Sequence, residues 1–328
     1  PFAFMDPAAT RNPHNLESSP GGSSSGSAAA VAAGHIPVAI GTQTNGSVIR
    51  PASFCGVYGF KPSAGMIPRT GVLRTSETLD QVGVFARYYE DVALVGDVIS
   101  EFDPVDPNSF CRPRPRLLNG VCSEPPVAPN FVWFEMPYFD KLSDDSREGM
   151  MAVLDALGLS CDCFSAAGSF TVILDSQNII NYYEISRNLA AMSDNHNDTL
   201  SPQVAKLMSY VASISDEAYQ EAIDCRRGAV SYFASFFNDF DAIITPAAPG
   251  EAPLFSAGNT GNPIFSTVWT LCELPCLNMP VLMSENDMPI GVQLVGGREE
   301  DDRLLRVGSW MLAALNAVEA DAPKSNET

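Results

Sequence analysis

Residues 21–27 read GGSSSGS and run directly into the alanine-rich stretch AAAVAA. A flexible linker would join two independent patterns, but here a buried-helix pattern begins at the last serine. A second turn, Asn45-Gly46-Ser47, follows shortly afterwards, so two serine-bearing turns flank one helix–strand unit. Such turns bring backbone N–H groups and hydroxyls together at the ends of buried elements, which predicts an anion or oxyanion pocket.

The apolar periodicity along the rest of the chain alternates between short strands and helices, which predicts an α/β fold. A helix over 27–33 is expected to stop at Gly34, and a strand over 38–40 is expected to close at Gly41. We expect later helices from about residue 88, over 146–158, two or three over 176–240, and one in DDRLLRVGSWMLAAL, with strands over 242–245 and 289–297.

The net charge, the apolar runs and the cysteine pattern limit the kinds of partner and cofactor that we expect for this chain. The net charge of −20 argues against nucleic acid, because binders of a phosphate backbone need a basic face. No apolar run approaches the ~20 residues of a membrane span. The eight cysteines contain no Cys-x-x-Cys pair, and the close pair Cys161 and Cys163 has no partner for a metal site nearby. We therefore expect reduced thiols, a cytoplasmic protein and no metal or cofactor.

The stretch GGSSSGSAAAVAAGHIPVAIGTQTNGSVIRPASFCGVYGFKPSAG resembles the glycine- and serine-rich signature of the amidase signature family. The stretches DPAATRNPHN, TLDQVGVFARYYEDVALV, DAIITPAAPG and PIGVQLVG are also similar to that family. The resemblance implies one large α/β domain over 1–315, incomplete at its N-terminus, with a central mixed β-sheet flanked by helices on both faces. Within it, 102–129 would be a Pro-rich surface connection and 130–230 a variable, substrate-facing helical part, followed by a tail over 316–328.

The same resemblance implies an amidase that hydrolyses a carboxamide C–N bond through a seryl acyl-enzyme, giving a carboxylate and ammonia or an amine. Its Ser–cis-Ser–Lys triad needs no cofactor and no metal. Ser47 corresponds to the nucleophile, and Ser23 to the bridging serine, which would follow a cis peptide bond after Gly22. The Ser23 hydroxyl is then expected within hydrogen-bond reach of that of Ser47.

These residue types suit the chemistry. A serine hydroxyl is a weak nucleophile until a base removes its proton, and a buried lysine can serve because burial favours its neutral form. The resemblance places the oxyanion hole at the backbone N–H groups of Thr44, Asn45, Gly46 and Ser47, and the supporting turn at Gly21, Gly22 and Ser24.

Two departures from the family pattern concern the second turn. Gln43 stands where the family has an acid, and Arg50 is displaced by one position. We interpret them as a subgroup variant, which weakens the transfer of the usual roles of both residues. Together with the net charge of −20, they argue against a transamidation component that acts on charged tRNA.

A third departure concerns the base. The family's catalytic lysine precedes the first serine turn by several tens of residues, whereas only 22 residues precede Ser23. The four lysines are Lys61, Lys141, Lys206 and Lys324, of which Lys61 matches a structural position of the family. We therefore expect the lysine upstream of Pro1, and little amidase activity from the segment as given.

Two other functions remain open at this stage. Gly-x-Ser-x-Gly around Ser24 could be a nucleophile elbow with His196 as base, but an elbow follows a strand and NLESSP is polar. A non-catalytic amidase-like scaffold would explain the missing lysine. We expect a small-molecule amide as substrate, no nucleic acid or membrane partner, and a homo-oligomer as an open possibility. The stretch VILDSQNIINYYEISRNLAAM fits an acyl pocket and core packing equally well.

Overall fold

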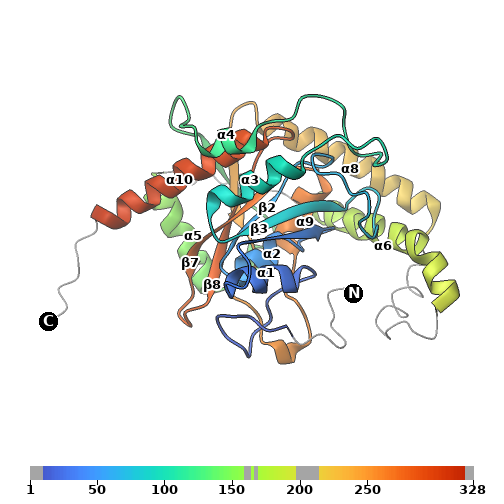
Figure 1. Cartoon of the computed structure of the whole chain (residues 1–328), viewed down its shortest axis with the longest axis horizontal. Helices are drawn as coiled ribbons and strands as arrows, with labels where there is room; N and C mark the ends of the chain where they lie inside the picture. Colours follow the sequence, from blue (N-terminus) through green and yellow to red (C-terminus); the bar gives the residue numbers. More distant parts are fainter. Residues whose placement is uncertain (1–9, 159–163, 166–168, 197–213, 322–328) are drawn as a thin grey trace.

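A computed structural model describes residues 10–158, 164–165, 169–196 and 214–321 of the chain. Its centre is an eight-stranded sheet in the order β1-β3-β2-β7-β8-β6-β4-β5 (Figure 1). The strands are β1 (Val38–Gln43), β2 (Tyr58–Lys61), β3 (Gln81–Ala86), β4 (Phe131–Glu135), β5 (Phe164–Ser165), β6 (Ala242–Pro246), β7 (Cys276–Met283) and β8 (Pro289–Val295).

The sheet is mixed, as expected. The pairs from β1 to β6 in this order are antiparallel, whereas β4 runs parallel to both β6 and β5. Strands β3, β6 and β8 are buried along their whole length, because helices cover both faces of the sheet.

The helices form two layers around the sheet (Figure 1). Helix α4 contacts both α3 and α10, and both α3 and α10 contact the sheet. On the other side, α1 and α2 contact each other and the strands, while α6 packs against α8 and α9. Their bounds are α1 (Ser25–Ala32), α2 (Ile49–Phe54), α3 (Tyr89–Ile99), α4 (Leu117–Val121), α5 (Asp144–Ala156), α6 (Ser169–His196), α8 (Asp216–Phe236), α9 (Ile264–Leu271) and α10 (Asp301–Asp321), with 3₁₀ turns η1 (Phe139–Lys141) and η3 (Phe255–Ala257).

An aromatic cluster joins the sheet to the helices on the α6 side. The ring of Phe134 on β4 packs edge-on against Phe233 and Phe236 of α8 and against Trp269 of α9, with centroid separations of 5.6, 5.6 and 6.0 Å. Phe134, Phe233 and Trp269 are completely buried. Burial of large rings in this geometry is the main force that fixes α8 and α9 on the sheet.

Several sequence-based expectations are confirmed: the helix after the first serine turn, the helices at α3, α5, α6, α8 and α10, and the strands at β6 and β8. The prediction that the first strand ends at Gly41 was wrong: β1 continues through Gly41 to Gln43. The expected domain boundary at residue 315 falls inside α10. None of the helices in the described ranges is long and apolar enough to cross a membrane.

Candidate active site

Ser23 and Ser47 line one cavity of about 730 Å³. This volume lies within the range of small-molecule pockets, which is about 300–1,000 Å³. The two serine turns predicted from the sequence therefore meet at one site. The wall is formed by Ser23, Thr42, Thr44, Asn45, Ser47, Arg50, Val72, Leu73, Thr75, Asp80, Lys141, Leu174, Asn178, Asn181, Tyr182, Ile185, Thr260, Asn262, Pro263, Ile264 and Thr267.

The first turn contains the cis peptide bond between Gly22 and Ser23, as predicted from the family resemblance. Gly21 has a φ of +81°, a conformation in which a side chain would be strained. The Ser24 hydroxyl lies 3.2 Å from both the N–H and the carbonyl of Thr42. Ser24 is thus a structural link between the first turn and β1.

The second turn is held by amide and hydroxyl side chains from distant elements. Gln43 Oε1 accepts the N–H groups of Val48 and Ile49 at 2.8 and 3.0 Å, while its Nε2 donates to Thr270 Oγ1 at 2.8 Å. The Thr270 hydroxyl in turn donates to the carbonyl of Asn45 at 2.6 Å. Gln43 therefore provides the acceptor that an acid would provide at the start of α2, and adds a donor toward α9.

We expect Gln43→Leu to lower the free energy of unfolding by about 2 kcal/mol, because two buried N–H groups lose their acceptor. Urea unfolding measures this change. Gln43→Glu is the matched variant, since it keeps an acceptor for the two N–H groups and replaces the donor to Thr270 with a carboxylate oxygen. A Leu variant as stable as the native protein would contradict the assigned role.

The backbone N–H groups of Asn45, Gly46 and Ser47 donate no hydrogen bond to any residue in the described ranges. A Cβ on Gly46 would lie 2.8 Å from Pro263 Cβ, so the turn has no room for a side chain there. The hydroxyls of Ser23 and Ser47 likewise have no hydrogen-bond partner among the described residues. The relay between the two hydroxyls consequently remains a prediction.

Arg50 connects the first turn to the loop before α9. Its guanidinium donates to the carbonyls of Gly22 and Gly261 at 2.6 and 2.8 Å, and it lies 3.3 Å from Thr260 Oγ1. Arg50 is 5% exposed, and burial lowers its pKa to about 10. The displaced arginine therefore fixes the carbonyl that precedes Ser23, a role that its sequence position did not reveal.

Asp80 and Arg69 organise the opposite wall. Both Asp80 oxygens are used, by the Thr44 and Thr75 hydroxyls and by the N–H groups of Thr75 and Ser76. Arg69 donates to the carbonyl of Asp80 at 3.2 Å and pairs with buried Asp106 at 2.8 Å. The wall segment is thereby held by a buried ion pair outside the cavity.

One face of α6 lines the cavity through Leu174, Asn178, Asn181, Tyr182 and Ile185. This spacing follows the helical repeat, so the stretch that the sequence left open between acyl pocket and core packing contributes to the cavity wall. Buried Gln177, on the same helix, bonds to the carbonyl of Thr44 and to the side chain of Asn45, each at 3.2 Å. The sequence pattern did not distinguish the residues of α6 that line the cavity from Gln177, which bonds to the second turn.

The two histidines whose side chains the structure describes do not support the nucleophile elbow. His14 Nε2 lies 3.0 Å from the carbonyl of Cys55, His35 is exposed, and neither lines the cavity, while His196 is the last residue of α6. Within the described ranges, Ser24 also follows a loop and not a strand. Both observations count against that alternative.

Lys61 also lies outside the cavity wall. It is completely buried, and its Nζ donates to the Gln81 side chain and to the carbonyls of Pro62 and Leu274. Burial lowers the pKa of Lys61, but all three donors are used in structural bonds. Lys141 is the described lysine that reaches the cavity, whereas Lys206 and Lys324 lie outside the described residues.

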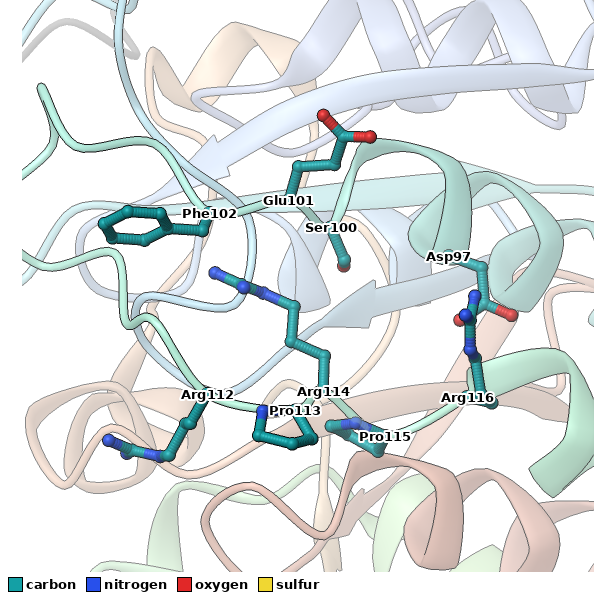
Figure 2. A pocket seen from close by; sticks show the side chains of 9 residues that line it. All are labelled: Asp97, Ser100, Glu101, Phe102, Arg112, Pro113, Arg114, Pro115 and Arg116. Atoms are coloured by element: carbon teal, nitrogen blue, oxygen red, sulfur yellow. The ribbon is translucent and has the colours of Figure 1, made fainter.

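A second pocket of about 540 Å³ contains none of the predicted site residues (Figure 2). Its arginines alternate with prolines, and Figure 2 shows Arg112 and Arg114 pointing to different sides. Arg112 pairs with Glu299, and Arg114 bonds to the carbonyls of Met66 and Gly65. The serine-lined cavity is therefore the candidate active site.

Comparison with known proteins identifies the class to which this fold and site belong. The sequence profile of the Amidase family matches residues 7–305, and the chain belongs to that family. A glutamyl-tRNA(Gln) amidotransferase subunit of Chlamydia pneumoniae is 31% identical over 338 residues, which cover 91% of this chain and 66% of the relative. The chain thus spans slightly less than two thirds of that relative's length.

Solved structures agree with this assignment. The 6-aminohexanoate cyclic dimer hydrolase complexed with substrate matches with a TM-score of 0.81 and 26% identity, over 93% of this chain and 70% of the other. A vestigial protein complex, described as revealing the origins of an s-triazine catabolic enzyme, matches with a TM-score of 0.86 and 25% identity, over 95% of this chain and 69% of the other.

Proposed function

We propose that the protein is an amidase that cleaves a carboxamide C–N bond through an acyl-enzyme on Ser47. The Ser47 oxygen forms a bond to the carbonyl carbon, and the C–N bond breaks as the leaving nitrogen takes up a proton. Water then attacks the ester, and the acid leaves while the proton returns to Ser47. Ser23 passes the proton between Ser47 and the base.

The observation that carries this proposal is the common position of the two serines beside unused backbone donors. Ser23 and Ser47 line one cavity, and the N–H groups of residues 45–47 have no acceptor among the described residues. Preorganised donors of this kind stabilise a developing oxyanion, and the loss of one typically costs about 10²–10³ in rate. The supporting turn, Gly21, Gly22 and Ser24, positions Ser23.

The base is not assigned to a described residue, since Lys61 is engaged elsewhere and Lys141 is exposed. This gap motivates the second candidate function, a non-catalytic amidase-like scaffold.

We also propose that 130–230 faces the substrate, because α6 lines the cavity. A reducing, cytoplasmic location is part of the proposal and is supported by the six described cysteines, which are all free.

Labelling with a fluorophosphonate distinguishes the two candidates. We expect the full-length gene product to be labelled on one residue, Ser47, because only an activated serine reacts with this probe. Peptide mass spectrometry locates the label, and Ser27→Ala, which changes a half-buried serine of α1 outside the cavity wall, is the control. A folded protein that remains unlabelled at Ser47 would favour the scaffold.

A further inference from the structure

The charges of the cavity wall differ from those of the whole chain. The chain carries a net charge of −20, yet among the described residues the wall contains two cations, Arg50 and Lys141, and one carboxylate, Asp80. The described lining therefore has one more positive than negative side chain. Because the field of more distant surface charges is screened beyond about 8 Å, the charges of the wall contribute most to what a bound molecule meets.

Two of the three charged groups are already committed to the protein. Asp80 accepts four hydrogen bonds from Thr44, Thr75 and Ser76, and Arg50 donates to two backbone carbonyls and a threonine hydroxyl. Arg50 forms no ion pair with any acid in the described ranges. Its charge consequently adds to the positive potential, while Nη1 and Nη2 are engaged by the protein and the buried Nε has no partner among the described residues.

Lys141 is the available cation. Its ammonium group has no hydrogen bond or ion pair with any residue in the described part of the chain, and the side chain is exposed. An exposed lysine presents a compact, strongly hydrated point charge with three donors, which is a suitable contact for an anion.

The backbone that carries Lys141 is firmly anchored. The residue ends η1 (Phe139–Lys141), where the Phe139 ring packs 5.2 Å from Trp133 and 5.8 Å from Phe265. Arg147 donates to the carbonyl of Phe139 at 2.8 Å. A charged group on such a support can be presented to a ligand without first ordering a loop, which lowers the entropic cost of binding.

We propose that the substrate is an amide that also carries a carboxylate, and that Lys141 contacts this carboxylate while Ser47 faces the amide. The proposal rests on the amidase function proposed above and names its substrate class. Lys141 is then a specificity-determining residue: it selects the acyl or amine part of the substrate by charge, and the serine turns perform the chemistry.

Binding to a Ser47→Ala protein tests the proposal without turnover. The probes are the amide acids succinamate, glutaramate and adipamate, each compared with the diamide of the same length, in which a carboxamide replaces the carboxylate. Ligand-observed NMR titration gives the ratio of the two dissociation constants at each length. We expect at least one amide acid to bind about fivefold more tightly than its diamide, the effect of one partly exposed ion pair.

Matched variants in the same background assign the preference to Lys141. Lys141→Gln should bring the ratio to about one, Lys141→Arg should keep it, and added salt should reduce it. The control is Arg116→Gln, which removes an exposed arginine of the second pocket (Figure 2) and should leave the ratio unchanged.

The outcomes separate this proposal from the proposed function. Equal binding of acids and diamides at every length, or a preference that survives in Lys141→Gln, overturns the assignment even if the fluorophosphonate labels Ser47. A preference that depends on Lys141 supports the assignment, including in a protein that the fluorophosphonate does not label, where only the amidase proposal fails.

Discussion

Replacement of Ser47 by alanine is expected to reduce amide hydrolysis by the full-length gene product about 10⁴- to 10⁶-fold. The change removes the oxygen that we propose forms the acyl-enzyme. The members of a catalytic triad act as a unit, so the loss of one forfeits most of the rate gain. Hydrolysis of a simple aryl amide, followed by release of the amine, measures the effect.

The fold should tolerate the Ser47→Ala change, since the hydroxyl makes no hydrogen bond to the described residues. Thermal unfolding should therefore be unaltered, which separates lost chemistry from lost structure. Ser27→Ala is the control, because that hydroxyl bonds to the carbonyl of Ile40 and lies outside the cavity wall. Retention of a tenth of the native turnover by Ser47→Ala would remove Ser47 from the mechanism.

The largest expected loss of stability concerns the ion pair behind the cavity. Arg69 and Asp106 are joined by two side-chain hydrogen bonds, and their side chains are 3% and 0% exposed. We expect Asp106→Asn to lower the free energy of unfolding by about 3–5 kcal/mol, because a buried guanidinium is left without its counter-ion. Urea unfolding at neutral pH measures it, and Asp224→Asn, which breaks the exposed pair with Arg227, should cost at most about 0.5 kcal/mol.

The same pair gives a pH dependence of stability. Burial acts to raise the pKa of Asp106, but hydrogen bonds from Arg69 and Asn108 outweigh it and lower the pKa to about 2. The folded pKa lies below the unfolded value of about 3.9, so the contribution is complete above about pH 5 and is lost as the pH falls through the folded pKa of about 2. Asp106→Asn should lack this part of the acid transition; an identical acid profile in both proteins would contradict the assignment.

Sequence predicted the parts of the fold whose signals are local. The two serine turns and the helix between them follow from small residues at tight, close-packed turns. Strand β7 was missed because Pro280 interrupts its pattern, and the register shift between Met279 and Leu282 shows how the strand accommodates it. Helix α2 was missed because Pro51 lies in its first turn, a position where proline is tolerated.

Of the residues that form the candidate site, the sequence predicted the two serines and the turns that carry them, but not the distant side chains around them. The groups that hold the second turn, Gln177 and Thr270, are more than 130 residues away in sequence from it. Lys141 is similarly remote in sequence, and it reaches the cavity from the end of η1. Such partners leave no periodic or motif-like signal, since only the packing of α6, α9 and η1 brings them together.

In helix α6, some residues anchor the helix to the rest of the protein and their neighbours line the cavity. This separation has a consequence for how new substrates could be acquired. Gln177 ties the helix to the second turn, and about two turns further on Glu184 accepts hydrogen bonds from Ser76, Thr78 and Tyr219. Residues 174, 178, 181, 182 and 185 instead line the cavity. Variation confined to those five positions would reshape the cavity wall while both anchors keep the second turn in place, so laboratory evolution should randomise them and hold 177 and 184 constant.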